Sequence, residues 1–135
     1  MKHTYLVLAA LFIGFAANAQ HLKCKSTEVV TYEGNKHGVS KKINAVIDIN
    51  AEQNKIDINE APPTHLTIIK RLEANVENKG AANEARTMTY LVKDSKGAQK
   101  KAELVLFIHA QNGVNGALIV HTTNGSSLAY SLVLL

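Results

Sequence analysis

The feature that most constrains the fold is a regular alternation of apolar and polar residues on both sides of a short polar turn. Every second residue of segment 43–49 is apolar, and Ile56 and Ile58 continue the alternation after the turn at 51–54. Successive side chains of a β-strand point to opposite faces of the sheet. With this turn, all of the isoleucines fall on one face. The sequence therefore predicts a β-hairpin over residues 42–59 with one buried face.

The rest of the chain repeats this pattern of short strand-like segments separated by turn signals. The alternation slips near Lys70 and Arg71, which indicates a β-bulge. Proline cannot donate to a strand ladder, so Pro62 and Pro63 end the strand that precedes them. We predict an all-β fold, a single antiparallel meander of about eight strands that forms a small barrel or sandwich. The further strand-like segments are 26–32, 65–76, 86–93, 101–109, 117–122 and 128–134.

Asparagine–glycine pairs mark turns in the C-terminal third, because both residues tolerate positive φ. Such pairs occur at 112–113, 115–116 and 124–125. A two-residue turn at 112–113 pairs His121 with residue 104, and a longer turn shifts its partner by two or three residues. In either register, several residues at ~3.3 Å each separate His121 from His109. That is too far for a shared ion with Zn–N bonds of ~2.1 Å, so we expect ordinary surface histidines.

The first nineteen residues have the layout of a signal peptide. Lys2 and His3 precede an apolar run over 5–17, and Ala17–Asn18–Ala19 then forms an A-x-A cleavage site. The apolar run is too short to span a bilayer, which takes roughly 20 residues. We expect cleavage before Gln20, a single domain over 20–135 without a transmembrane segment, and export to the periplasm or the medium.

The composition argues against several classes of partner. The formal net charge is +4, and the basic residues are dispersed along the chain without an accompanying aromatic cluster. Nucleic-acid binding proteins usually gather basic residues into a patch, so we expect no nucleic-acid partner. Cys24 is the only cysteine. An internal disulfide is therefore excluded, and we expect Cys24 to be buried as a small apolar side chain.

The layout resembles small exported bacterial β-meander proteins of the broadly lipocalin-like kind. The resemblance lies in an early strand over 23–32, the isoleucine hairpin, a Lys-Asp-Ser-Lys-Gly turn at 93–97 and a closing Leu-x-Tyr-x-Leu strand at 128–132. Lipocalins carry a Gly-x-Trp motif near the first strand, whereas this chain contains no Trp. The resemblance implies a barrel architecture and transfers no functional residue.

Several C-terminal strands are apolar on both faces, which is unusual for an antiparallel sheet. In segment 101–109, Val105 and Phe107 lie on the face opposite to Leu104, Leu106 and Ile108. A loop, the other sheet or a partner subunit should cover this second face. We therefore expect Val105 and Phe107, together with Tyr130 of the closing strand, to form a ligand or partner surface.

The hairpin register also brings two carboxylates together. When residue 50 pairs with residue 55, Asp48 lies directly opposite Asp57 on the polar face, flanked by Asn50 and Asn59. Like charges that face each other across strands repel, so something should compensate them. One hypothesis is a Ca²⁺ ion bound by these four residues, since Ca²⁺ prefers oxygen ligands. The alternative is that both carboxylates are solvated, with Lys55 or Lys41 reaching over them.

We expect an exported, non-catalytic binding protein without a cofactor other than this calcium. In one version the barrel holds a small apolar ligand, and an enclosed pocket above ~300 Å³ would favour it. The alternative is a protein–protein interaction module, which a packed interior with an exposed apolar strand would favour. A small hydrolase is the weakest reading, because no nucleophile motif is present. It would need a cleft in which groups such as His65, His37 or Asp48 converge.

Overall fold

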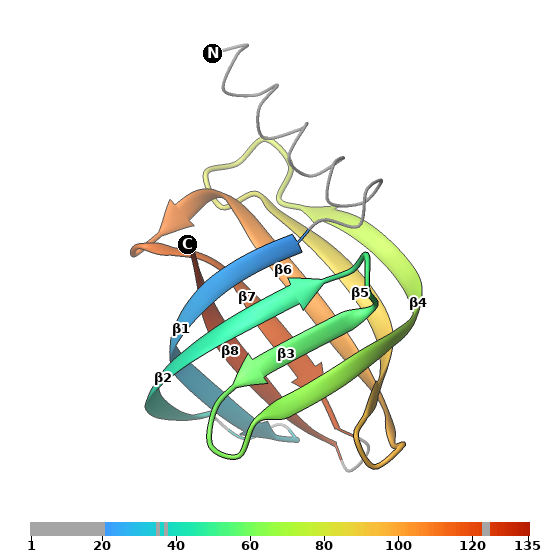
Figure 1. The fold of residues 1–135 in the computed structure, drawn as a ribbon. Coiled ribbons are helices and arrows are strands. Elements are labelled where there is room, and N and C mark those ends of the chain that lie inside the picture. Colours follow the sequence, from blue (N-terminus) through green and yellow to red (C-terminus); the bar gives the residue numbers. More distant parts are fainter. Residues whose placement is uncertain (1–20, 35, 37, 123–124) are drawn as a thin grey trace.

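The computed structural model describes residues 21–34, 36, 38–122 and 125–135. The predicted signal peptide and His37 lie outside this part of the chain. Eight antiparallel strands follow one another around a closed barrel, and β8 pairs with β1 to complete it (Figure 1). The all-β meander is thus confirmed, with a barrel as its form. The strands are β1 (His21–Glu33), β2 (Val39–Asn50), β3 (Lys55–Asn59), β4 (Thr64–Glu77), β5 (Ala85–Asp94), β6 (Gln99–Gln111), β7 (Val114–His121) and β8 (Ser126–Leu134).

The β2–β3 hairpin has the register that the isoleucine pattern predicts. Asn50 pairs with Lys55, and Ile47 pairs with Ile58. The four isoleucines of this pairing, at 47, 49, 56 and 58, are at most 1 % exposed. Their common face therefore points into the barrel, and the alternating polar residues point outward.

The central part of the barrel interior is filled by side chains. Tyr90 is fully buried and packs with aliphatic residues from most of the strands. Cys24 is fully buried and reduced, as expected. Burial raises the pKa of the Cys24 thiol to about 11, because the charged thiolate is poorly solvated there. The largest fully buried side chains are Tyr90, Ile47, Ile49, Ile56, Ile58, Leu66, Leu104, Leu118, Leu132, Val92, Cys24 and Ser26.

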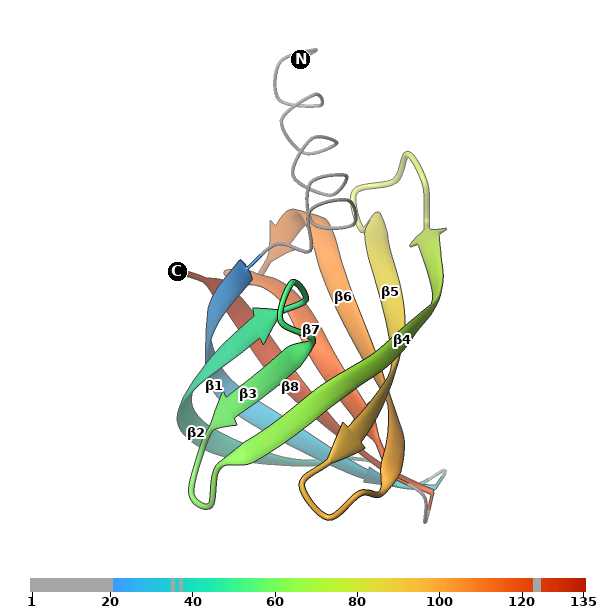
Figure 2. The same ribbon diagram turned by 45° about the vertical axis from the view of Figure 1, so that its right-hand side comes forward.

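Strand β4 is much longer than β3, its neighbour on one side. Only residues 64–67 of β4 pair with β3, whereas residues 66–77 pair with β5. The register with β5 shifts between Ile68 and Lys70 and again between Arg71 and Glu73, which confirms the predicted bulge. Figure 2 shows the second half of β4 rising beyond the β2–β3 turn. Among the described residues, 69–77 therefore have a strand partner on one side only.

The pairing of β6 with β7 differs from both predicted registers. Gln111 pairs with Val114 across the expected Asn112–Gly113 turn, but His121 pairs with Lys101 rather than with residue 104. The ladder shifts between Leu106 and Gln111, where β6 uses extra residues. The predicted turn at 115–116 was wrong, because these residues lie within β7.

A close backbone approach explains the glycine within β7. A Cβ atom at Gly116 would lie 2.0 Å from the carbonyl oxygen of Val105. The two strands come together at the irregular part of the ladder, where no side chain fits at this position.

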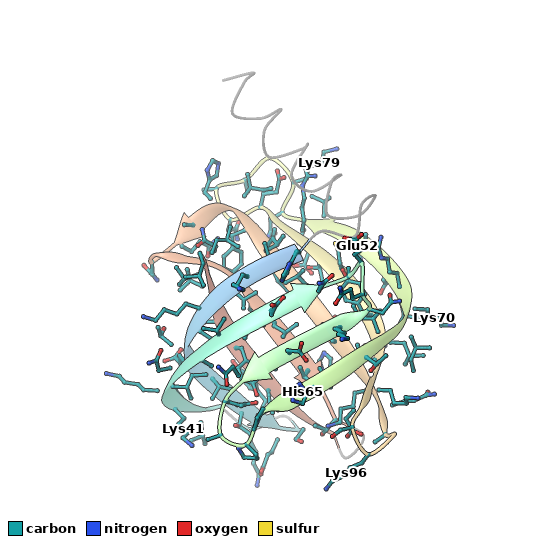
Figure 3. All side chains as sticks on the ribbon, viewed as in Figure 1. Lys41, Glu52, His65, Lys70, Lys79 and Lys96 are labelled. Carbon is teal, nitrogen blue, oxygen red and sulfur yellow. The ribbon has the colours of Figure 1, made fainter. Side chains whose placement is uncertain are left out.

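The barrel has two ends that differ in their connections. The β1–β2, β3–β4, β5–β6 and β7–β8 connections lie at one end, here called the lower end, and the remaining turns lie at the upper end. Figure 3 places Lys41 and Lys96 at the lower end, and Glu52 and Lys79 at the upper end. Within the described residues, no helix has the length and apolar character needed to cross a membrane.

Candidate functional site

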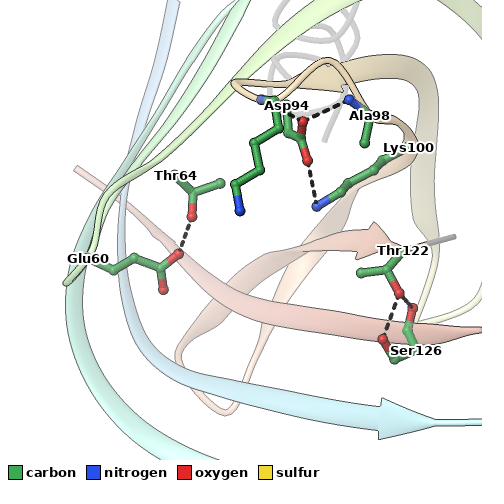
Figure 4. A network of polar contacts seen from close by, with 8 residues as sticks. Glu60, Thr64, Asp94, Ala98, Lys100, Thr122 and Ser126 are labelled. Atoms are coloured by element: carbon green, nitrogen blue, oxygen red, sulfur yellow. Dashed lines mark hydrogen bonds and ion pairs between the residues drawn. The ribbon is translucent and has the colours of Figure 1, made fainter. Parts of the chain in front are cut away.

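Polar side chains replace the apolar core at the lower end of the barrel. A partly buried carboxylate with two hydroxyl partners stands out there. The Tyr130 hydroxyl lies 2.9 Å and 3.2 Å from the two carboxylate oxygens of Glu60. The Thr64 hydroxyl donates to the same carboxylate at 2.8 Å (Figure 4). Two hydroxyl donors from β4 and β8 therefore hold the Glu60 carboxylate in a fixed position.

A second charged group at this end lies at the β5–β6 turn. The backbone N–H groups of Lys96 and Ala98 each donate to Asp94 Oδ1 at 2.9 Å. Lys100 Nζ lies 3.4 Å from Asp94 Oδ2. The N–H of Ala98, followed by that of Lys96 and the ammonium of Lys100, lowers the pKa of Asp94 against a smaller opposing effect of desolvation. The Asp94 carboxylate therefore has its hydrogen-bond donors and its counter-charge within the protein.

Glu60 differs from Asp94 because it has no basic partner. Among the described residues, no Lys, Arg or His nitrogen lies within 4.0 Å of its carboxylate oxygens. A carboxylate has about four lone-pair sites, and the hydroxyls of Tyr130 and Thr64 do not use all of them. Glu60 keeps capacity to accept a further donor.

A pocket of about 260 Å³ adjoins Glu60 at the rim of the barrel. Lys41 is one of its lining residues, and within the described residues no carboxylate lies within 4.0 Å of the Lys41 ammonium. Ile43 and Ala45 add apolar surface. Residues of opposite charge and two apolar residues therefore line one small hollow. Its lining residues are Lys41, Ile43, Asn44, Ala45, Glu60 and Ala61.

The three residues predicted as a ligand or partner surface do not share one surface. Tyr130 points into the barrel and is 2 % exposed. Burial, and then the hydrogen bond and the charge of Glu60, raise the pKa of Tyr130. Val105 and Phe107 alternate with buried Leu104 and lie on the outer face, where both are partly exposed. Tyr130 instead lies on the inward face of β8, at the opening of the barrel's lower end, here called the lower mouth.

Asp48 and Asp57 face each other on the outer surface, as the hairpin register predicts. Two histidines from the flanking strands accompany them. His21 Nε2 contacts Asp48 Oδ1, and His65 Nδ1 lies 2.8 Å from Asp57 Oδ1. His65 lies within β4, directly opposite Asp57. The side-chain contacts to the two carboxylates therefore come from imidazoles of β1 and β4, and not from Lys55 or Lys41, which the solvated alternative named.

The other two predicted calcium ligands have different surroundings. Asn50 Oδ1 accepts the backbone N–H of Gln53 at 3.1 Å and so caps the β2–β3 turn. Asn59 pairs with Val46 at the end of β3 and is exposed. Among the described residues, no group of three or more His, Cys, Asp or Glu residues has a geometry that could hold a metal ion. The calcium hypothesis, which includes asparagine ligands, stays a prediction.

A chain of polar contacts on the outer face of β6, β7 and β8 has the residue types of a hydrolase triad. Ser127 Oγ lies 2.9 Å from His121 Nδ1, and His121 Nε2 lies 2.8 Å from Glu103 Oε2. Ser127 belongs to a strand that is paired on both sides, with Tyr32 and with His121. Its backbone N–H lies within a strand ladder rather than in an oxyanion hole. The trio therefore acts as a cross-strand contact that links three strands.

Sequence reasoning missed Glu60, because its site depends on closure of the barrel. Glu60 follows β3 directly, next to the predicted strand end at Pro62 and Pro63. Its partner Tyr130 lies 70 residues later in the chain. One signal in the sequence could have indicated the site. Glu60 continues the alternation of Ile56 and Ile58, so its side chain, like that of Tyr130, is expected to point into the barrel.

A function for this chain has to be inferred from its fold and from this site. No family model matches the chain, and neither a curated protein nor a solved structure matches it. The fold defines a small closed antiparallel barrel, and the lower mouth is its most specific polar feature.

Proposed function

We propose that this protein is an exported, non-catalytic binding protein that holds a small zwitterion, such as an amino acid, at the lower mouth of its barrel. The observation that carries the proposal is the Glu60 carboxylate, which Tyr130 and Thr64 orient and which no basic group of the described residues neutralises. A primary ammonium group is the complementary ligand, because it donates charge-assisted hydrogen bonds.

The other lining groups define the rest of the ligand. The ammonium of Lys41 would attract a carboxylate, and Ile43 with Ala45 would contact a short aliphatic side chain. A volume of about 260 Å³ lies just below the range of ~300 to 1,000 Å³ that is usual for drug-sized ligands. The pocket therefore suits a molecule of amino-acid size.

The packed centre of the barrel favours this location over the interior. Side chains such as Tyr90, Ile47 and Leu118 are fully buried there and occupy the space that a lipocalin-like ligand would use. An apolar ligand in the centre would have to displace them, at the cost of close packing. The ligand site that the geometry supports is therefore polar and lies at the mouth.

Thermal unfolding with three matched probes tests this proposal. Leucine carries both charged groups, butylamine carries only the ammonium, and butyrate carries only the carboxylate. At about 100 times Kd, a ligand stabilises a protein by about 2.7 kcal/mol, so leucine should raise Tm by roughly 10 °C. Butylamine and butyrate should each give a smaller shift.

Two variants assign the effect to the charged groups. Glu60→Gln should abolish the response to butylamine and most of the response to leucine, whereas Lys41→Gln should abolish the response to butyrate. Glu52→Gln, an exposed change at the upper end, is the matched control and should respond as the native protein does. Equal responses in Glu60→Gln and Glu52→Gln, or no response to any probe in the native protein, would refute the proposal.

A further inference from the structure

The second half of β4 is an open strand edge. Asn54 O accepts the N–H of Ile68 at 2.8 Å, and this is the last backbone contact between β4 and the β2–β3 side of the barrel within the described residues. Residues 69–77, here called the open edge, have β5 as their one strand partner in the described part of the chain. Their other side therefore presents backbone N–H and C=O groups that no described strand satisfies (Figure 2). Such an edge is a template for pairing with another strand.

The side chains of the open edge are exposed as well. Every residue from 69 to 77 is exposed, including three large apolar residues. Ile69 is 44 %, Leu72 is 40 % and Val76 is 45 % exposed. Proteins usually protect an edge of this kind with charges or bulges, and the open edge has both near its start, at Lys70 and Arg71. Beyond the second bulge, residues 73–77 form a regular and unprotected strand.

The charge order along the open edge identifies the strand that fits it. Basic residues come first, at Lys70 and Arg71, and acidic residues follow, at Glu73 and Glu77. An antiparallel copy of the same segment places its acidic end against the basic start, and a parallel copy places like charges together. Charge complementarity thus points to a second copy of this chain in antiparallel orientation.

Two-fold symmetry narrows the register further, because one residue must then lie opposite its own copy. With Ala74 on the axis, Leu72 at the bulge lies opposite Val76, and Arg71 on the far side of the bulge comes close to Glu77. With Glu73 on the axis, two carboxylates would face each other. The arrangement about Ala74 pairs apolar with apolar and basic with acidic residues.

We propose that the open edge of β4 pairs antiparallel with the open edge of a second copy, about a two-fold axis at Ala74. The contact joins the two sheets and covers Leu72 and Val76. The regular part of the edge is short, so the dimer should be reversible and should depend on concentration. Because the mouth at Glu60 lies at the lower end, the dimer leaves the proposed ligand pocket accessible.

Sedimentation velocity from micromolar to millimolar concentration tests the proposal. The native protein should shift from monomer to dimer, and added salt should weaken the dimer. Glu77→Lys and Arg71→Glu should each remain monomeric, since each places like charges opposite each other. An equimolar mixture of the two variants should recover a dimer, because opposite charges then face each other again. Glu33→Lys, with the same charge change at an exposed site on β1, should dimerise as the native protein does.

Amide hydrogen exchange of the native protein gives an independent measurement if a variant does not fold correctly. In the native protein, exchange at residues 73–77 should slow as concentration rises, while exchange at the exposed turn residues Glu52 and Gln53 should not change. A protein that stays monomeric at millimolar concentration would overturn the proposal. A dimer that persists in Glu77→Lys with unchanged exchange at 73–77 would overturn it too.

Discussion

Tyr130 of β8 reaches across the lower end of the barrel to place its hydroxyl 2.9 Å from Glu60 Oε2, on the segment after β3. This contact connects the closing strand to the opposite wall of the barrel. It also fixes the carboxylate on which the proposed binding site depends. The same hydrogen bond therefore contributes to stability and to the geometry of the mouth.

The change Tyr130→Phe should lower the free energy of unfolding and weaken ligand binding together. A hydrogen bond to a charged group contributes about 1.5 to 3 kcal/mol, so a loss in this range is expected from urea unfolding. Tyr32→Phe is the matched control, because Tyr32 is 41 % exposed, and this change should cost little. An equal loss of stability in both variants would mean that the Glu60 contact is not the cause.

The hairpin core can be tested by a pair of alanine variants. Ile47 is fully buried opposite Ile58, so Ile47→Ala should lower the free energy of unfolding by about 2 to 5 kcal/mol. Asn44 is exposed on the same strand, and Asn44→Ala should cost less than about 0.5 kcal/mol. Urea unfolding measures both values, and similar losses would contradict the register.

The hairpin was predictable because turn length and side-chain alternation each specify the same register. Other parts depend on contacts that no local pattern encodes. The extra residues of β6 between Leu106 and Gln111 displace His121 from its expected partner, and nothing in the alternation of β7 indicates this shift. Similarly, His21 reaches Asp48 only because β1 pairs with β2 from its first residue, where His21 lies opposite Asn50.

The candidate site was less predictable than the fold. A sequence shows that Glu60 and Tyr130 both have an inward phase, but only closure of the barrel brings β8 close to the β3–β4 connection. The open edge of β4 was hidden for a related reason. Its length was predictable from the alternation over 65–76, whereas the early end of the pairing with β3 requires the arrangement of the strands in space.

The outer pair of aspartates predicts a specific response to calcium. If Asp48 and Asp57 bind Ca²⁺, millimolar calcium should raise Tm, and Asp57→Asn should abolish the shift. Without calcium, Asp57→Asn should leave Tm unchanged or raise it slightly, because the change removes a like-charge contact. Thermal scans of both proteins with and without calcium separate these effects. An identical calcium response in the two proteins would remove this pair as the site.

Asp94 should contribute to acid sensitivity. Hydrogen bonds from the N–H groups of Ala98 and Lys96 and the charge of Lys100 lower its folded pKa below the ordinary value of 3.8. The ionised form is thus favoured in the folded state, so the stabilisation is present above that value and is lost as pH falls through the lower folded pKa. Asp94→Asn should therefore lose less stability than the native protein below about pH 4. Urea unfolding across this pH range measures the difference, and parallel curves would contradict the assignment.

The central claim is that a small zwitterion binds beside Glu60, and a two-dimensional NMR titration of the labelled protein with leucine tests it most directly. The amide signals of Glu60, Ala61 and Thr64 should move together and saturate, while those of Glu52 and Lys79 at the upper end should stay in place. The same titration of Glu60→Gln should leave the lower-end signals unmoved. Stationary signals around Glu60 in the native protein, or saturable changes confined to the upper end, would contradict the claim.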